Sequence, residues 1–427
     1  VEEIDDIHEV YHTALTETGF YFCDSIGWKK VDFDASRAEP MKGVRVLMIQ
    51  PHQKPIETRV IDRLDCWQRV VSDHGEDALM EVISPFDDNA VVVCNEESKY
   101  NGMEGNRANN KVFNKMHNHA TWATSAVGMI GMAMGDDTLV RKALYGTDET
   151  GKHGGFIQQL DYLFSPDGYF TEGAYYQRYA IWPFMVFAQC IDHNRPDLKI
   201  FQYRDGILLK AVSTLLQLAY DGRFMRFNDA LLKGYDAQEL VYAVNIAYNA
   251  DPSNKTLLDV AARYQDWVLP TDAGFAVARD IARGEAQPLT FHSALFRDGR
   301  NGDEGGIAVI RSTDPALNSA LTLKATAHGL SHGHYDKLTI AYYDNDNEVL
   351  CDYGAARWLN IEAKYKGHYT HENKSFAMQT VAHNTLGVDE RSHFDGNYDE
   401  SMKHHSEILF TDFSRKDVQI VSARETN

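Results

Sequence analysis

The stretch HGLSHGHYDKLTIAYYDNDNEVLCD, residues 328–352, determines how the rest of the chain is interpreted. Residues 338–343 alternate between two faces as a strand does, residues 344–347 are turn formers, and residues 349–351 resume an extended pattern. This pattern predicts a β-hairpin. Because a hairpin brings its two ends together, we expect His334 near its start and Asp352 at its end to be neighbours in space.

Histidines and a carboxylate at the ends of this hairpin suggest a metal site. Imidazole nitrogen and carboxylate oxygen are ligands that suit zinc. His332 and His334 are two positions apart on chain that should be extended, so their side chains should point to opposite faces. At most one of them can then join Asp352 and the later His383, and the other is left for chemistry. Any one of these histidines alone is more simply a surface residue, but the set of four favours a metal.

Size and composition limit the classes of function. The 427 residues are enough for two or three domains with buried cores. The formal net charge of −20 argues against nucleic acid and against an anionic membrane surface as partners. The aromatic fraction of 11% suits sugar-binding clefts as well as large cores. The five cysteines lack CxxC spacing, which argues against a disulfide framework and against a cysteine-bound zinc.

Two features of the sequence bear on membranes and on export. We find no apolar run of transmembrane length. The N-terminus, VEEIDDIHEV, is not a signal peptide, although the chain could begin after a removed one. The residues themselves therefore leave the compartment undetermined.

Residues 1–280 are predicted to be mostly helical. The run ATWATSAVGMIGMAM, which follows His117-Asn118-His119, is apolar nearly all round and predicts a helix buried on every side. Residues 44–49 look extended, and residues 95–115 read as a long irregular loop. The other predicted helices are joined by short turns, which indicates an all-α ring or bundle. They cover residues 8–15, 61–74, 78–83, 136–145, 156–164, 175–193, 201–220, 237–250 and 253–269.

After Pro270 the pattern changes from helices to strands. Pro and Gly cluster near residues 270–288, where we place the domain boundary, with a helical domain at 1–280 and a sheet domain at 281–427. Because the last residues are strand-like, we expect the sheet domain to continue beyond Asn427. The predicted strands of this antiparallel sheet are residues 289–296, 306–312, 320–327, 338–343, 349–351, 407–411 and 418–421.

Polar clusters in both domains predict a cleft between them that is rich in phenols and imidazoles. The clusters contain His117-Asn118-His119, the segment TEGAYYQRY, His332, and the segment RWLNIEAKYKGHYTHEN. A glycosidase needs two carboxylates that flank the scissile bond, and no such pair stands out. The residue types instead suit β-elimination of a uronic acid chain, in which donors and cations quench the developing enolate charge.

Two reacting groups are needed for that elimination, a base for the C5 proton and an acid for the leaving O4. Tyr can serve in either role if nearby groups stabilise its phenolate, as His332 and Arg178 could. Structural interpretations compete with these roles. Asn118 could equally cap the buried helix, at least one of Tyr175 and Tyr176 could be a core aromatic, and Arg357 could form a surface ion pair. Tyr369 lies in a polar segment, which favours function.

In this order, the segments HNHATW, DGYFTEGAYYQRYA, HGLSHGHYDKL, LCDYG, GHYTHEN and VAHNTL resemble the heparinase II/III-like polysaccharide lyases. The likeness spans residues 110–385 and is greatest to the alginate and oligoalginate lyases of polysaccharide lyase families 17 and 39. The resemblance implies an α+β multidomain fold, with an (α/α) toroid of helices followed by an antiparallel β-sandwich. It also implies one structural zinc, held by His334, Asp352 and His383.

The same resemblance implies the roles of the active-site residues. Asn118 and His119 would neutralise the substrate carboxylate, and either His117 or His119 could face the sugar. The base would be a tyrosine of the EGAYY motif, and we choose Tyr176 over Tyr175 because it lies four residues after Glu172, as similar lyases place it. The remaining roles are Tyr369 as the acid, His332 as an assistant at the reacting face, and Arg357 as the residue that grips a sugar carboxylate, with Tyr175 and Arg178 beside the substrate.

Three functions are compatible with these residues. The first is a lyase for alginate or its oligosaccharides that leaves an unsaturated uronate, or a related lyase for another uronate polymer such as a glycosaminoglycan. The second is a non-catalytic uronan-binding protein on the same fold, and the third is a zinc hydrolase with an open metal position. By resemblance we expect a periplasmic or secreted protein, an acidic polysaccharide partner, and possible homodimers, with no nucleic acid and no membrane span.

Overall fold

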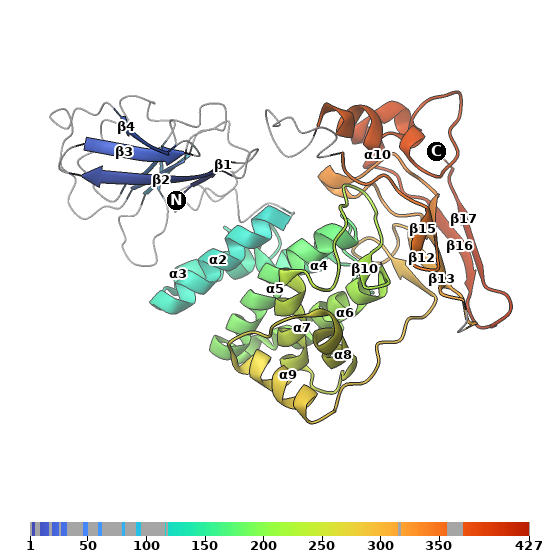
Figure 1. Ribbon diagram of the computed structural model, residues 1–427, viewed down its shortest axis with the longest axis horizontal. Coiled ribbons are helices and arrows are strands. Elements are labelled where there is room, and N and C mark those ends of the chain that lie inside the picture. The colour runs from blue at the N-terminus through green and yellow to red at the C-terminus, as the bar shows by residue number, and fades with distance from the viewer. Residues whose placement is uncertain are drawn as a thin grey trace. The chain divides into compact units, whose positions relative to one another are not determined.

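The computed structural model describes eight strands between residues 2 and 94, residue 116, and residues 118–314, 317–356 and 370–426 (Figure 1). The chain divides into two compact units. The first contains residues 1–115, 126–156 and 358–370, and the second contains residues 116–125, 157–357 and 371–427. The candidate site described below lies within the second unit.

The N-terminal strands form two four-stranded sheets. The first is antiparallel and contains β1 (Glu2–Ile4), β2 (Glu9–Thr16), β3 (Gly19–Asp24) and β4 (Gly27–Val31) in sequence order. The second has the order β6-β5-β8-β7, in which β5 and β8 are parallel. Its strands are β5 (Val46–Ile49), β6 (Arg59–Ile61), β7 (Leu79–Glu81) and β8 (Val91–Cys94).

Some predictions for this N-terminal part are corrected by these strands. The helices expected at residues 8–15 and 78–83 are wrong, since β2 and β7 occupy these positions. EVYHTALT has apolar residues that fit either a helical or a two-residue period, and pairing with the aromatic β3 decides for the strand. The extended stretch at 44–49 is confirmed by β5. Residues 62–74 and the predicted loop at 95–115 lie outside the described residues.

Helices predominate from residue 118 to residue 282. The predicted helices at 136–145, 156–164, 175–193, 201–220, 237–250 and 253–269 are confirmed, with shorter ends at the last three. Asp136 caps the second helix through its carboxylate, which accepts from the N–H groups of Thr138 and Leu139. The helices are α2 (Asn118–Met134), α3 (Asp137–Tyr145), α4 (Gly155–Leu163), α5 (Ala174–Asn194), α6 (Tyr203–Gln217), α7 (Gln238–Ala250), α8 (Thr256–Tyr264) and α9 (Asp272–Ala282).

Two features of the helices differ from the prediction. The start of α2 is buried, but Ala126, Ala133 and Met134 are exposed, so the helix is not buried on every side. The small residues GMIGMAM lower the contrast between its faces, and sequence pattern alone therefore could not show which end reaches solvent. The second feature is α9, which occupies the region where we expected the domain boundary. This helix was missed because it begins only two residues after Pro270, and we interpreted that proline as the end of the helical part.

Large apolar side chains form the core of the helical part. The ring of Phe164 packs on Phe170 at 5.3 Å and on Phe184 of α5 at 5.0 Å between centroids, and all three are fully buried. α5 contacts α6 and α7, and α7 contacts α8 and α9. The long central helix α5 is thus surrounded on several sides, which fixes the position of the tyrosines at its start.

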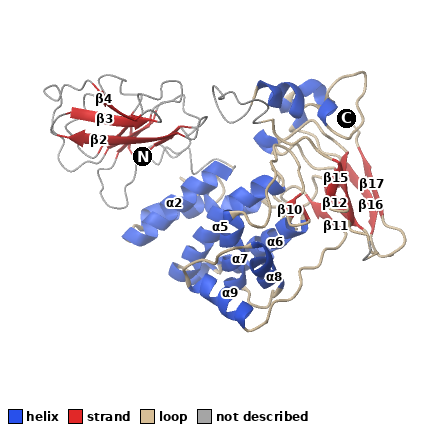
Figure 2. Cartoon of the chain, viewed as in Figure 1, coloured by secondary structure: helices blue, strands red, loops and turns tan. Residues whose placement is uncertain are grey.

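A five-stranded antiparallel sheet follows the helices, with its strands in sequence order (Figure 2). In β13 and β14, buried and less buried positions alternate, as expected for a sheet with one covered face. The predicted hairpin is confirmed, because β14 pairs antiparallel with β15 across the turn at Asn345-Asp346. The strands are β11 (Ala294–Arg297), β12 (Gly306–Arg311), β13 (Ser319–Lys324), β14 (Thr339–Asp344) and β15 (Asn347–Leu350), and a separate hairpin joins β16 (Glu407–Asp412) to β17 (Ile420–Arg424).

Side chains from both parts connect the helices to the sheet. Arg297 of β11 forms hydrogen bonds of 2.7 and 2.8 Å with the carboxylate of Asp167. The buried guanidinium of Arg311 in β12 donates to the carbonyl oxygens of Gln217 and Ala219, at 2.8 and 2.7 Å. These contacts join β11 to the loop that precedes α5, and β12 to the end of α6 and the segment that follows it. From residue 118 on, the predicted order of helices followed by an antiparallel sheet is confirmed, whereas the eight strands described between residues 2 and 94 correct the prediction of a mostly helical N-terminal part.

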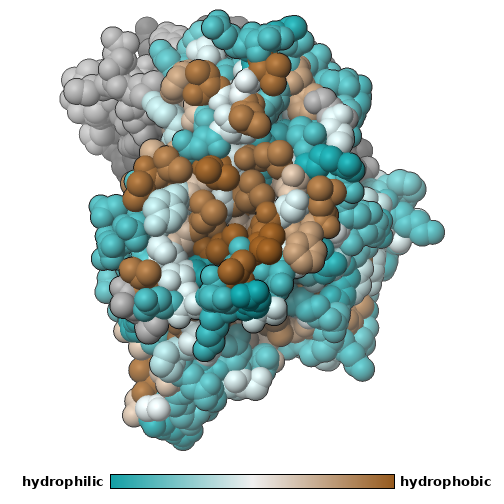
Figure 3. Space-filling view, turned by 90° about the vertical axis from the view of Figure 1, so that its right-hand side faces the viewer, coloured by the Kyte–Doolittle hydropathy of each residue, from teal (hydrophilic) through white to brown (hydrophobic). Residues whose placement is uncertain are grey.

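Apolar side chains are exposed around the last strands. Figure 3 views the side of the molecule that lies on the right in Figure 1 and shows hydrophobic residues gathered on it. Val349 and Leu350 of β15, Leu409 and Phe410 of β16, and Ile420 of β17 are among the exposed large hydrophobic residues. Among the described helices, none combines the length and the apolar character needed to cross a lipid bilayer.

Candidate functional site

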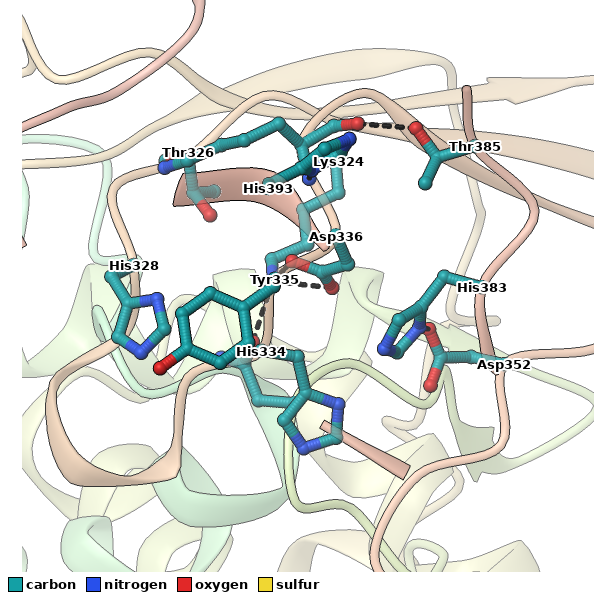
Figure 4. Close-up of polar contacts among 12 residues, drawn as sticks. Lys324, Thr326, His328, His334, Tyr335, Asp336, Asp352, His383, Thr385 and His393 are labelled. Carbon is teal, nitrogen blue, oxygen red and sulfur yellow. Dashed lines mark hydrogen bonds and ion pairs between the residues drawn. The ribbon is translucent and has the colours of Figure 1, made fainter. Parts of the chain in front are cut away.

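The ends of the β14–β15 hairpin bring together three potential metal ligands. His334 precedes β14, Asp352 follows β15, and His383 follows a short 3₁₀ turn at Thr380–Ala382. One ligand atom from each of the three lies within 4.8 Å of the other two, and all three side chains are buried. Figure 4 shows these side chains facing one another. The neighbourhood of His334 and Asp352 predicted from the hairpin is thus confirmed.

The unused ring nitrogens of this triad fit a metal ion. His334 Nδ1 and His383 Nε2 are both buried and have no hydrogen-bond partner among the described residues, although buried polar atoms ordinarily have one. His383 Nδ1 lies 3.0 Å from Asp352 Oδ2. Burial favours the neutral imidazole, but the charge of Asp352 outweighs it and the pKa of His383 lies above its ordinary value. Two histidines and one carboxylate could therefore hold a metal here.

Asp229 connects this triad to the neighbouring histidine. The residue lies on the loop between β10 (Arg223–Phe224) and α7. Its Oδ1 is 3.0 Å from His334 Nε2 and 2.9 Å from Asn373 Nδ2, and its Oδ2 is 3.2 Å from His332 Nδ1. Burial alone would raise the pKa of Asp229, but hydrogen bonds from the two histidines outweigh it and hold the pKa below the ordinary value. The carboxylate is consequently ionised and contacts both histidines of the HGH motif.

His332 faces the start of α5. Its imidazole stacks on the phenol ring of Tyr176, with 3.6 Å between ring centroids and 11° between planes. Tyr175 meets Tyr176 edge to face at 5.2 Å. The prediction that the two histidines of HGH diverge is confirmed, because His334 belongs to the triad while His332 contacts Tyr176. Of the two tyrosines, Tyr176 is therefore the one next to the predicted assisting histidine.

Arg178 lies on the other side of Tyr175. Its guanidinium packs 4.6 Å from the centroid of the Tyr175 ring and forms an ion pair with Glu239 of α7. Only 4% of the arginine is exposed. This pairing ties α5 to α7, and a role of Arg178 at the substrate stays a prediction.

A buried carboxyl group, Glu172, lies near His332 and Asp229. The residue is fully buried, and in the part of the chain that the structure describes neither carboxyl oxygen has a hydrogen-bond partner. Burial raises the pKa of Glu172 to about 7, and the nearby charge of Asp229 acts in the same direction while His332 opposes it. At neutral pH this group is therefore divided between its protonated and ionised forms.

A second buried network supports the same loops from behind. Lys324 of β13 donates to Asp336 Oδ1 and Oδ2 at 2.6 and 2.7 Å, and to Asn228 Oδ1 at 2.5 Å. Asn228 Nδ2 in turn donates to the carbonyl oxygen of Glu172 at 3.0 Å. Because every member is buried, the network holds the HGH loop, the Glu172 loop and residues 228–229 in one arrangement.

For the other predicted site residues, the structure describes only part of the surroundings. Asn118 is the first residue of α2 and is 2% exposed. One turn later, Trp122 packs on Tyr179 and Trp182 of α5 at 5.3 and 5.0 Å, so this end of α2 lies against the tyrosine-bearing helix. The roles predicted for these side chains stay predictions. His119 lies in α2 but its side chain is outside the described residues, as are His117, Arg357 and Tyr369.

Sequence reasoning missed Asp229 and Asn228 and used Glu172 only to choose between two tyrosines. The segment RFNDALLKG has no spacing that relates it to the histidines a hundred residues later. One local signal was present, because the polar pair Asn-Asp lies between two apolar stretches. In the structure both side chains are buried, which is unusual for Asn and Asp.

Comparison with known proteins finds similarity to two families of lyases. Residues 296–427 match the family described as Heparinase II/III-like, C-terminal, and residues 99–224 match the family described as Alginate lyase. The chain is 51% identical over 318 residues to an exo-oligoalginate lyase of Saccharophagus degradans. Over these residues the chain is similar to the heparinase II/III-like and alginate lyase families. The family resemblance expected from the motifs is confirmed.

Relatives of this heparinase II/III-like chain are longer than the chain itself. The match to the Saccharophagus degradans protein covers 74% of this chain and 43% of the relative. An alginate lyase of Stenotrophomonas maltophilia is 46% identical over 351 residues, which cover 82% of this chain and 46% of the relative. The matched region thus covers less than half the length of either relative. Residues 41–128, which include β5–β8, match a domain of unknown function named DUF3846.

The fold of the family is also found among solved structures. A heparinase III structure superposes with a TM-score of 0.51 at 15% sequence identity, and the match covers 73% of this chain and 42% of that chain. At this identity the likeness shows the fold alone. It is consistent with helices followed by antiparallel sheets, as described above.

Proposed function

We propose that this heparinase II/III-like chain is a polysaccharide lyase that cleaves alginate or alginate oligosaccharides by β-elimination. The observation that carries the proposal is the stack of Tyr176 on His332, next to a carboxylate that orients the histidine. This arrangement offers a phenol and an imidazole to the substrate, rather than the two carboxylates that a glycosidase uses. The relatives, named as alginate lyases, support the substrate class.

In the proposed reaction, Tyr176 removes the proton from C5 of the uronate. The electron pair of the C5–H bond forms the C4=C5 double bond, and the C4–O4 bond breaks. Tyr369 donates a proton to the leaving O4. Asn118 and His119 neutralise the sugar carboxylate, which allows charge to develop on it as the proton leaves. Arg357 binds a carboxylate of the sugar chain, with Tyr175 and Arg178 beside the substrate.

His332 assists Tyr176 at the reacting face. A tyrosine acts as a base only where neighbours stabilise its phenolate, because a free phenol titrates at about pH 10. The stacked imidazole, 17% of which is exposed, is positioned to provide such stabilisation and to remain accessible to substrate. Glu172, buried behind this pair, supplies a further carboxyl group whose charge depends on pH near neutrality.

We further propose that the triad of His334, Asp352 and His383 binds zinc as a structural ion. Its nitrogen and oxygen donors suit zinc. When bound, the ion would supply a fixed positive charge that links the hairpin ends to residue 383.

We also propose the finer architecture that the family implies, namely an (α/α) toroid and a β-sandwich, with the domain boundaries at residues 1–280 and 281–427. A periplasmic or secreted location and homodimers are part of the same proposal.

A panel of polymers tests the proposed reaction. The full chain is incubated with mannuronate-rich alginate, guluronate-rich alginate, alginate oligosaccharides and heparan sulfate, and ultraviolet absorbance of the unsaturated uronate is followed. Absorbance that rises on an alginate substrate and is lost in Tyr176→Phe supports the proposal. Reducing ends formed without absorbance would instead indicate a hydrolase, and binding without either product would indicate a non-catalytic uronan-binding protein. Absorbance on heparan sulfate alone would assign a glycosaminoglycan lyase.

A further inference from the structure

We propose that Asp229 is a positioning residue that sets the proton positions on both histidines of the HGH motif at once. Through one carboxylate it prepares His334 as a metal ligand and His332 as a proton acceptor at the reacting face. The part that concerns His332 rests on the proposed lyase function. The part that concerns His334 rests only on the triad.

The two oxygens of Asp229 are used by different nitrogens of the two rings. Oδ1 lies 3.0 Å from Nε2 of His334, and Oδ2 lies 3.2 Å from Nδ1 of His332. An ionised carboxylate can only accept hydrogen bonds, so each of these ring nitrogens must carry the proton. In the neutral imidazoles, His334 is then protonated on Nε2 and His332 on Nδ1. The two histidines are held in opposite tautomers.

Each tautomer leaves the nitrogen that the site needs. In His334 the unprotonated nitrogen is Nδ1, the buried atom that has no hydrogen-bond partner within the described ranges. A carboxylate behind a metal-binding histidine orients the ring and strengthens the ligand. In His332 the unprotonated nitrogen is Nε2, on the edge of the ring opposite Nδ1. That nitrogen can accept a proton or a hydrogen bond beside Tyr176.

Asp229 is itself fixed from several directions. Asn373 Nδ2 donates to its Oδ1 at 2.9 Å, and its own N–H donates to the carbonyl oxygen of His332 at 3.1 Å. The preceding residue, Asn228, has a positive φ of 60° and is held by Lys324. With 2% of the residue exposed, the carboxylate has no room to turn toward solvent. Its orientation is therefore set by the fold and is passed on to both rings.

Other buried carboxylates near the site do not connect the two histidines. Among the described hydrogen bonds, Asp352 joins His383 and the N–H of Gly354, and Asp336 joins Lys324. Only the Asp229 carboxylate contacts both the triad and the partner of Tyr176 in the described part of the chain. This singles out Asp229 as the link between the two halves of the site.

Nuclear magnetic resonance of the unchanged full chain tests the proton positions directly. Long-range ¹H–¹⁵N correlation spectra of protein labelled with ¹⁵N-histidine distinguish the two tautomers, and His332→Gln and His334→Gln identify the signals. We expect His334 protonated on Nε2 and His332 on Nδ1. The opposite tautomer in either ring overturns the inference, whether or not any lyase activity is found.

Asp229→Asn tests the consequence for metal and catalysis. An amide offers one acceptor oxygen and an NH₂ donor, so it cannot accept from both histidines, and one ring must change its proton position or lose its bond. We expect the variant to lose its metal to a chelator at a concentration about 10–100-fold lower than wild type does, and kcat on alginate to fall by about 10–100-fold while KM changes little. Asp167→Asn is the matched control, because it makes the same chemical change at an aspartate that pairs with Arg297 outside the site. It should retain the resistance to the chelator and the kcat of wild type.

Contrary results are readily recognised. If Asp229→Asn keeps wild-type tautomers and wild-type resistance to the chelator, the positioning role is wrong. If wild type cleaves no uronate polymer, the proposed lyase function fails, but the spectra and the chelator titration still decide the role of Asp229. If Asp229→Asn does not fold, the spectra of the unchanged chain decide it.

Discussion

The two histidines of the HGH motif lie two residues apart but in different surroundings. His334 has a fully buried side chain and faces Asp352 and His383, whereas 17% of the His332 side chain is exposed and its ring stacks on Tyr176. A closed, buried triad is typical of a structural metal site, and a partly exposed imidazole beside a phenol is typical of a site for proton transfer. Under the proposed function, one loop would serve stability on one side and chemistry on the other.

Tyr176→Phe should give the largest effect and should act on the reacting side alone. The substitution removes the phenol oxygen but keeps the ring that stacks on His332, so we expect kcat to fall by about 10²–10⁴-fold with a nearly unchanged melting temperature. Kinetics by ultraviolet absorbance and a thermal melt measure the two quantities. Tyr175→Phe is the matched control. A large loss in Tyr175→Phe, with full activity in Tyr176→Phe, would transfer the role of base to Tyr175.

His383→Ala should act mainly on the buried side. It removes a proposed metal ligand and leaves the Asp352 carboxylate buried without its imidazole partner, a change that costs about 3–5 kcal/mol in the free energy of unfolding. Thermal unfolding with and without a chelator tests this expectation. The chelator should lower the melting temperature of wild type and leave that of the variant unchanged. An equal shift in both proteins would place the metal elsewhere.

Glu172→Gln should show how pH changes the stability of the protein through a carboxyl group buried near His332. The pKa of Glu172 is raised from 4.5 to about 7 in the folded protein. The folded state thus holds the proton more tightly than the unfolded state, and stability falls as pH rises from about 4.5 through about 7. By linkage, this cost reaches about 3 kcal/mol above pH 7.

The Gln variant carries no charge and should escape this cost. We expect its melting temperature to exceed that of wild type at pH 8 and to approach it at pH 5. Melting curves across this pH range provide the measurement. A constant difference between the two proteins at all pH values would show that Glu172 does not titrate there.

Asp167→Asn should give the smallest effect, because it lies outside both sides of the site. Its ion pair with Arg297 is partly exposed, with side-chain exposures of 25% and 49%. Pairs of this kind contribute about 0.2–1 kcal/mol. Denaturant unfolding should therefore detect a small loss, with kcat unchanged. A loss as large as that of His383→Ala would mean that the helix-to-sheet contact, rather than the triad, dominates stability.

Local patterns were sufficient for much of the fold and for part of the site. Alternation in LTIAYYD and the turn at Asn345-Asp346 predicted the hairpin, and the hairpin alone placed His334 next to Asp352. Helical periodicity between residues 136 and 264 predicted most helices. Such patterns succeed where one face of an element is buried, because burial then imposes a period that can be read from neighbours in the chain.

Sequence by itself thus determined the family resemblance, the order of helices and sheet from residue 118 on, and the divergence of His332 from His334. Only the tertiary structure decided that Asp229 contacts both histidines, that Arg178 pairs with Glu239, and that β2 is a strand. The physical reason is the same in all three cases. A hydrogen bond, an ion pair or a strand pairing depends on which distant segment lies opposite, and no local period records that segment.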